Sequence, residues 1–279
     1  MTAIHLILNM VGLLLWLKWL SVRIPSSTPA SRPIGFPGAS RKNPDLEQRL
    51  LWLGALALLV PLRGLVYWQI GPALHWTPHL SLGAILLTFR SDHLSRMMLF
   101  SAVGLFLTLA EFHLCLLLFS ITIPRTATET PLLRTVRGCL GWVDGWPAWL
   151  KLPLPLLVAG ALWFAAAPLL VKISLLLPPD SQTTTALQGL VLGASAYLAW
   201  AYTILFILLL FLIHTYVYLG VHPFWEFVQI AGDRFLKPLR AAHLRWRKVD
   251  FTPVIGIVLM WCLVRYLPPL LTTTFRRLH

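Results

Sequence analysis

Long apolar runs alternate with short polar stretches along the whole chain. Six of these runs are predicted to be helices, over residues 3–22, 50–70, 97–123, 152–176, 187–219 and 253–271. A helix rises about 1.5 Å per residue, so about 20 residues cross about 30 Å of hydrocarbon. A membrane β-barrel would instead show short segments of alternating apolar and polar residues. The pattern therefore predicts an all-α, polytopic membrane protein with about six transmembrane helices.

The segments near the N-terminus have distinct characters. Residues 1–22 predict an uncleaved transmembrane anchor, because Lys18 and Arg23 follow the apolar run and no small-residue cleavage pattern is clear. Four prolines among Ser and Gly in residues 24–43 predict a mobile cytoplasmic linker, which is assigned to 23–49. Within 50–96, the apolar stretch 79–90 follows the second span and is too short to cross, so it is predicted to be interfacial or re-entrant.

The composition agrees with a membrane protein. The 279 residues are 57% hydrophobic and only 12% charged, and the mean hydropathy is +0.74. The net charge of +13 does not indicate nucleic acid, because the basic residues gather beside apolar runs and not on a separate domain. The three cysteines form no CxxC pattern, so no zinc cluster or c-type haem attachment site is encoded, and we expect no resident cofactor.

The distribution of Lys and Arg predicts the orientation. Loops 23–49, 124–151 and 220–252 hold 5, 4 and 6 of these residues, whereas the opposite side holds only Arg90, Arg96, Arg276 and Arg277. Because positive loops are retained in the cytoplasm, both termini are predicted to lie outside.

Two of the cytoplasmic loops have the pattern of amphipathic helices. In the second loop, Phe224, Phe227, Val228, Ala231, Phe235 and Leu239 recur every three or four residues, opposite polar positions that include Asp233 and Lys237. The first loop repeats this pattern and adds Trp142, Trp146 and Trp149 as interfacial anchors. We expect both helices to lie along the membrane, with Asp233 paired to Lys237. The predicted contacts to anionic lipid headgroups are Arg134, Arg137, Lys237, Arg240, Arg245, Arg247 and Lys248.

The two loops and their flanking spans are predicted to be copies of one unit, over 97–176 and 187–271. Pro131 and Pro223 open the loops at an offset of 92 residues. Pro153 and Pro168 match prolines 100 residues later, in the span that follows the second loop.

The second copy contains three short motifs in order. They read His222-Pro-Phe-Trp-Glu-Phe-Val, then Phe235-Leu-Lys-Pro-Leu-Arg240, then Val249-Asp-Phe-Thr-Pro-Val-Ile255. In this order they resemble the YggT (YlmG) family of integral membrane proteins, which carry an Asn-Pro, a Pro-Leu-x-Pro-x-Arg segment and an Asp-Phe-Ser/Thr-Pro before a span. The match is best over 200–271, and its motif positions are Pro223, Pro238, Arg240, Asp250, Thr252 and Pro253.

The resemblance implies a non-enzymatic accessory or assembly protein of the bacterial cytoplasmic membrane. Family members are associated with haem attachment to a cytochrome complex, with cell division or with membrane organisation. Two departures stand out: His222 replaces the usual Asn, and the first copy has Lys151-Leu-Pro-Leu-Pro where Asp-Phe-Thr-Pro would stand. In the second copy, Asp250 is expected to cap the helix that begins near Pro253.

Ionisable residues inside spans are functional candidates, because a lone charge in hydrocarbon is costly. Arg63 and Glu111 lie deepest, and we expect a buried pair or an ion path from them. His113 and His214 are weaker candidates for haem ligation, since they lie at different depths of the two copies. Lys18, Lys172 and Arg265 lie close enough to span ends to snorkel.

Three functions follow from these features. The first is a scaffold or assembly factor that acts through its basic surface helices on anionic lipid headgroups and on other membrane proteins. The alternatives are an ion or small-solute channel or transporter that uses Arg63 and Glu111, and a haem-handling protein. An enzyme is not expected, because the sequence has no GxSxG, HExxH, Walker loop or GxGxxG.

Overall fold

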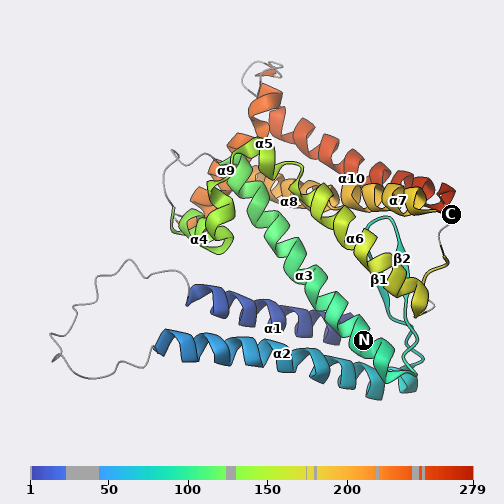
Figure 1. The fold of residues 1–279 in the computed structure, drawn as a ribbon. Helices are drawn as coiled ribbons and strands as arrows, with labels where there is room; N and C mark the ends of the chain where they lie inside the picture. Colours follow the sequence, from blue (N-terminus) through green and yellow to red (C-terminus); the bar gives the residue numbers. More distant parts are fainter. Residues whose placement is uncertain are drawn as a thin grey trace, which may run out of the picture. The chain divides into compact units, whose positions relative to one another are not determined.

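The computed structural model is almost wholly helical, which confirms the all-α prediction (Figure 1). It describes residues 2–22, 44–123, 130–173, 175–178, 181–217, 220, 222–240, 245–246 and 249–278. Within these residues, six helical segments are long and apolar enough to cross a membrane. They are formed by α1 (Thr2–Ser21), α2 (Pro44–Ile70), α3 (Leu94–Thr122), α6 (Leu154–Lys172) together with the short α5 (Ala148–Lys151), α7 (Gln182–Ser195) together with α8 (Tyr197–Tyr216), and α10 (Thr252–Arg277).

Shorter elements connect these helices. They are η1 (Pro72–Leu74), β1 (His79–Ser81), β2 (Leu86–Thr88), α4 (Pro131–Leu140), η2 (Gly141–Gly145), α9 (Pro223–Arg240), β3 (Arg245–Trp246) and β4 (Val249–Asp250). The strands form two small antiparallel hairpins. The order of long helix, short amphipathic helix and long helix occurs twice, in α3–α4–α6 and in α8–α9–α10. That the two copies arose by internal duplication stays a prediction.

The chain packs as two compact units. The first unit is Met1–Pro78 with Phe89–Ala110, and the second is His79–Thr88 with Glu111–His279. The helix α3 contributes to both, because its first part packs with α1 and α2 and its second part packs with the C-terminal helices.

Close helix contacts and one aromatic cluster hold the first unit together. Gly12 of α1 lies directly against Leu105 of α3, and Gly64 of α2 lies against Met98. Ser101 Oγ donates to the backbone carbonyl of Val60 at 2.7 Å, so α2 and α3 are joined by a polar contact as well. The rings of Tyr67, Trp76, Phe89 and Phe100 pack on one another at centroid distances of 5.4–5.6 Å.

In the second unit, α6 packs along α7 through glycines. Gly189 and Gly193 form a GxxxG pattern on α7, and Gly160 of α6 faces Gly189. A Cβ at Gly193 would lie 2.5 Å from the carbonyl oxygen of Leu156, so only glycine permits this approach. Small residues have this use in membrane helices, where close packing and not the hydrophobic effect drives association.

The segment 79–90, predicted to be interfacial or re-entrant, contains the hairpin β1–β2 (Figure 1). Its tip packs against α6 and α7: Ala84 is buried in one cluster with Trp163 and Leu192. Ser195 Oγ donates to the carbonyl of Leu82 at 2.9 Å. Gly83 lies against Ser195 with φ +79°, a conformation that favours glycine. The tip is therefore fixed to the helices by both apolar and polar contacts.

The helices α4 and α9 pack together, and we call the pair the α4–α9 platform. Leu133 of α4 and Val228 of α9 share a buried cluster with Phe119 of α3 and Ile207 of α8. Gly232 of α9 lies against the ring of Phe211, where a side chain would collide. The apolar face of α9 is thus buried largely in protein, although the sequence predicted a helix lying along the membrane. Periodicity identifies an apolar face but not what covers it.

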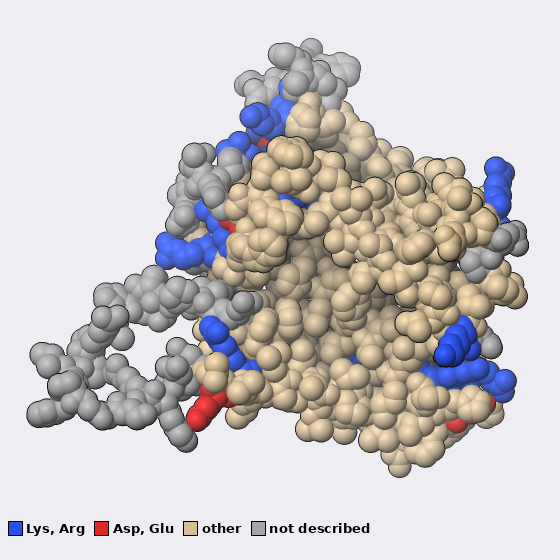
Figure 2. Space-filling view, viewed as in Figure 1, with Lys and Arg blue, Asp and Glu red and all other residues tan. Residues whose placement is uncertain are grey.

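The exposed surface fits a lipid environment. Most of the face drawn in Figure 2 is tan, so it carries no Lys, Arg, Asp or Glu. Large apolar side chains along the long helices stay exposed, including Leu157, Leu162, Leu169, Val258 and Leu270. Such an extent of exposed apolar surface is typical of membrane helices. Lys18, Lys172 and Arg265 are also exposed, as snorkelling requires.

The α6–α7 crossing generates a stability prediction. We expect Gly193→Val to lower the midpoint of thermal unfolding by several degrees, because overpacking a tight contact costs about 1–3 kcal/mol. Gly54→Val is the matched control, since a Cβ at Gly54 meets nothing within 4 Å. Equal unfolding midpoints for the two variants in the same detergent would show that the crossing is not tightly packed.

Candidate functional site

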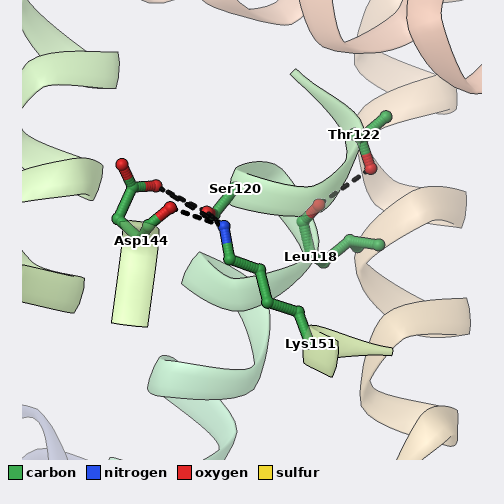
Figure 3. A network of polar contacts seen from close by, with 5 residues as sticks. All are labelled: Leu118, Ser120, Thr122, Asp144 and Lys151. Carbon is green, nitrogen blue, oxygen red and sulfur yellow. Dashed lines mark hydrogen bonds and ion pairs between the residues drawn. The ribbon is translucent and has the colours of Figure 1, made fainter. Parts of the chain in front are cut away.

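A buried polar network lies where α3 ends (Figure 3). Lys151 and Asp144 are only 3% and 8% exposed. Lys151 Nζ donates to Ser120 Oγ at 2.7 Å and to the carbonyl oxygen of Asp144 at 2.8 Å. Ser120 Oγ in turn donates to Asp144 Oδ1 at 2.6 Å, and the ion pair between Nζ and that carboxylate oxygen measures 3.9 Å. The three side chains therefore form a closed triangle of charge-assisted contacts.

The geometry of this triangle gives it a structural role. Ser120 accepts from the ammonium of Lys151 and gives its own proton to Asp144. A serine activated as a nucleophile would give its proton to a neutral amine, so the hydroxyl is used in the opposite sense here. The network links η2 and α5 to the end of α3, and thereby fixes the segment that leads into α6.

Sequence reasoning missed this network. Lys151 was counted as a loop cation, and Asp144 was not singled out, because both lie in a loop with no regular period. The available signal was the pairing of opposite charges seven residues apart among Trp, Gly and Pro residues. The segment that begins at Lys151 is where the first copy was predicted to depart from the motif of the second copy, and Lys151 itself belongs to the buried ion pair.

The structure places Arg63 in the first unit and Glu111 in the second. Arg63 is fully buried, and its Nη2 donates to Asn9 Oδ1 at 2.6 Å. Glu111 is exposed on α3. The pairing of Arg63 with Glu111 stays a prediction.

The two candidate histidines belong to the second unit and have separate surroundings. His113 lies next to the ring of Phe112 at 5.5 Å. His214 stacks on Trp225 of α9 with an interplanar angle of 3°, and its buried Nδ1 has no hydrogen-bond partner among the described residues. The stacking gives His214 a packing role between α8 and α9. Haem ligation by these residues stays a prediction.

The family-motif positions mark the ends of two helices. Pro223 begins α9, Pro238 lies within its last turn, and Arg240 ends it. Thr252 begins α10 and is 1% exposed, and Pro253 follows it in the first turn. The N-cap position is Phe251, which makes no side-chain capping bond, so the helix begins one residue later than an Asp250 cap requires. The side chain of Asp250 lies outside what the structure describes.

The structure describes the side chains of four of the seven residues that were predicted to contact lipid headgroups. Arg134, Lys237 and Arg240 are exposed and Arg137 is half-buried. Asp233 pairs with Arg240, at 2.7 Å from Nη2, where the sequence predicted Lys237. Positions seven residues apart lie two turns apart on the same face of a helix, so Asp233 can reach Arg240. The prediction considered only the residue four positions later, Lys237. Arg247 and Lys248 lie outside the described residues, as does the side chain of Arg245.

A ligand pocket and a metal site are two further kinds of functional site. A surface hollow of about 530 Å³ lies at the end of α2, lined by Leu65, Trp68, Gln69 and Pro72, and has no ionisable lining residue. Across the part of the chain that the structure describes, no group of three or more His, Cys, Asp or Glu side chains could hold a metal ion.

The six long apolar helical segments of the described residues indicate a multi-pass helical membrane protein. No protein-family model, no curated protein and no solved structure matches the chain.

The buried network generates a second prediction. Lys151→Met should destabilise the protein by about 3 kcal/mol or more, because it leaves the Asp144 carboxylate buried without its ammonium partner. Adding Asp144→Asn removes the buried negative charge. The loss of unfolding free energy in the double variant should therefore be smaller than the sum of the losses in the two single variants. The measurement is a double-mutant cycle of detergent unfolding, with the exposed Lys237→Met as control. Additive effects would mean that the two side chains are not coupled.

Proposed function

We propose that this protein is a non-enzymatic scaffold or assembly factor of the bacterial cytoplasmic membrane, related to the YggT family. It acts through the polar face of the α4–α9 platform. The observation that carries this proposal is the burial of the apolar faces of α4 and α9 against each other and against α3 and α8. A platform held in this way presents a fixed surface, as a docking site requires.

The charge of the platform suggests what it binds. Arg134 and Arg137 give α4 two positive charges, and α9 carries Arg234, Lys237 and Arg240 against Glu226 and Asp233. A surface with excess positive charge beside a membrane attracts anionic headgroups and acidic patches of other membrane proteins. Anionic lipid and acidic partner proteins are therefore the ligands that we propose.

The positions of the motif residues support a role in setting where α9 and α10 begin and end. Pro223 and Arg240 bound α9, and Thr252 and Pro253 begin the span that follows. Residues at these ends determine where the surface helix starts and where the chain turns toward α10. This role needs no reacting group, in keeping with the absence of a catalytic motif from the sequence.

The proposal is tested with charge reversal on the platform. In nanodiscs containing phosphatidylglycerol, Arg134→Glu with Lys237→Glu should reduce both retained anionic lipid, measured by native mass spectrometry, and crosslinked membrane proteins recovered from cells. The reason is that two attractive contacts become repulsive, at about 1 kcal/mol per charge near an anionic surface.

Arg276→Glu with Arg277→Glu is the matched control, because it changes the same charge at the end of α10. Unchanged lipid retention and unchanged partner recovery in the platform variant would refute the proposal. An equal loss in the control would show that charge alone, and not the platform, is responsible.

Cys139 on α4 provides a probe of platform packing. Burial raises the pKa of the Cys139 thiol above its usual value. The thiolate is the reactive form, and a raised pKa lowers its fraction at neutral pH. We therefore expect slow maleimide labelling near pH 7 and a rise in rate at a higher pH than for a free cysteine. Measurement on a variant with Cys115→Ser and Cys262→Ser isolates this site, and a solution-like pH profile would indicate that α4 is detached.

A further inference from the structure

The side chain of Arg63 contacts Asn9 and the Tyr67 ring, whose centroid lies 5.9 Å from Cζ, but the described residues of its own unit supply no negative charge to it. It is fully buried in α2, seven residues before the helix ends at Ile70. Within the described residues of the first unit, no carboxylate lies within ion-pair distance of it. The unit has three acidic residues: Glu47 and Asp45 lie about 24 Å or more away along the same helix, and Asp92 pairs with Arg90 at 3.3 Å. A buried, uncompensated charge inside a span is strongly unfavourable.

The hydrogen bonds around Arg63 fix the orientation of its neighbours. Arginine only donates, so Asn9 must turn its Oδ1 toward Nη2 and its Nδ2 toward His5. His5 Nε2 then accepts from Asn9 at 3.1 Å, which makes His5 neutral with its proton on Nδ1. That Nδ1–H donates to the hydroxyl oxygen of Tyr67 at 3.0 Å.

This arrangement leaves donors without acceptors. The Tyr67 oxygen accepts from His5 and from Arg63 Nη2 at 3.4 Å, so its own proton is directed elsewhere. Arg63 Nε and Nη1 are buried and have no hydrogen-bond partner in the described structure. Among the described residues, three donors therefore lack an acceptor: Nε–H and Nη1–H, which belong to the charged guanidinium itself, and the neighbouring Tyr67 O–H. A surplus of donors around a cation is the chemistry of an anion site.

We propose that Arg63 and Tyr67 bind an anion within the first unit. The bound group supplies negative charge and acceptor lone pairs, as a halide, a free phosphate or a lipid phosphate does. The rings of Tyr67, Trp76 and Phe100 pack beside the site, so the group it accepts is compact. Asn9 and His5 position the two donors and do not themselves neutralise charge.

Arg63 lies about 10 Å along α2 from the end of that helix, since seven residues separate it from Ile70. Asn9 and Phe100 likewise lie six to seven residues inside the starts of α1 and α3. The site is thus deep enough to exclude bulk water. It is also close enough to the helix ends for an anion from solution, or a headgroup drawn inward, to reach it. This site is separate from the α4–α9 platform.

The test uses the full chain, purified in an uncharged detergent in sodium gluconate. Sodium chloride, sodium phosphate and phosphatidylglycerol are added in separate arms, and the thermal unfolding midpoint is measured. At saturation the wild-type midpoint should rise by about 5 °C in at least one arm, since a ligand stabilises the state that it binds. A response to chloride or phosphate identifies a free anion, and a response to phosphatidylglycerol alone identifies a lipid phosphate.

Arg63→Gln should abolish the rise, whereas Arg265→Gln should keep it, because Arg265 is an exposed arginine in another span. If Arg63→Gln does not fold, Tyr67→Phe serves instead: it removes one donor and should weaken the anion's apparent affinity several-fold. The proposal is overturned if all arms leave the wild type unchanged, or if Arg63→Gln and Tyr67→Phe respond as the wild type does. It is also overturned if a response appears only in Glu111→Gln, because Glu111 would then be the counter-charge.

Discussion

A bilayer has no water in its hydrocarbon core, and this constraint shapes the whole protein. Every backbone polar group in that core must bond internally, so the crossing segments are helices and their apolar side chains can stay exposed. Leu157, Leu169 and Leu270, which would be liabilities in water, face outward for this reason. Helix association then depends on close fit, which the glycines of α6 and α7 provide at their crossing.

The same constraint makes each buried ionisable side chain informative, and the two most buried cations of the described residues meet it differently. Lys151 lies beside Asp144 and Ser120, so its charge is neutralised within one short stretch of chain and the contact fixes local structure. Arg63 is bonded to neutral groups only, and two of its nitrogens have no acceptor in the described structure. A satisfied ion pair points to stability, whereas an unsatisfied guanidinium points to a ligand.

The sequence predicted the spans well, because length and hydropathy decide whether a segment can cross a membrane. It also located the amphipathic helices, whose period is readable in residues such as Phe227 and Val228. It did not predict that these faces pack on Phe119 and Ile207, since periodicity reports an apolar face but not its partner. Contacts between distant residues were missed for the same reason: nothing in the order of residues connects Ser120 with Lys151, or Arg63 with Asn9.

The central claim is that α4 and α9 form one platform at one membrane face, opposite the end of α10. Labelling of single cysteines with an impermeant maleimide, in oriented membrane vesicles and a cysteine-free background, tests this directly. Cysteines at the exposed positions Arg134 of α4 and Gln229 of α9 should react from the cytoplasmic side, and one at Arg277 should react from the other side. Reaction of the first two from opposite sides would contradict the account.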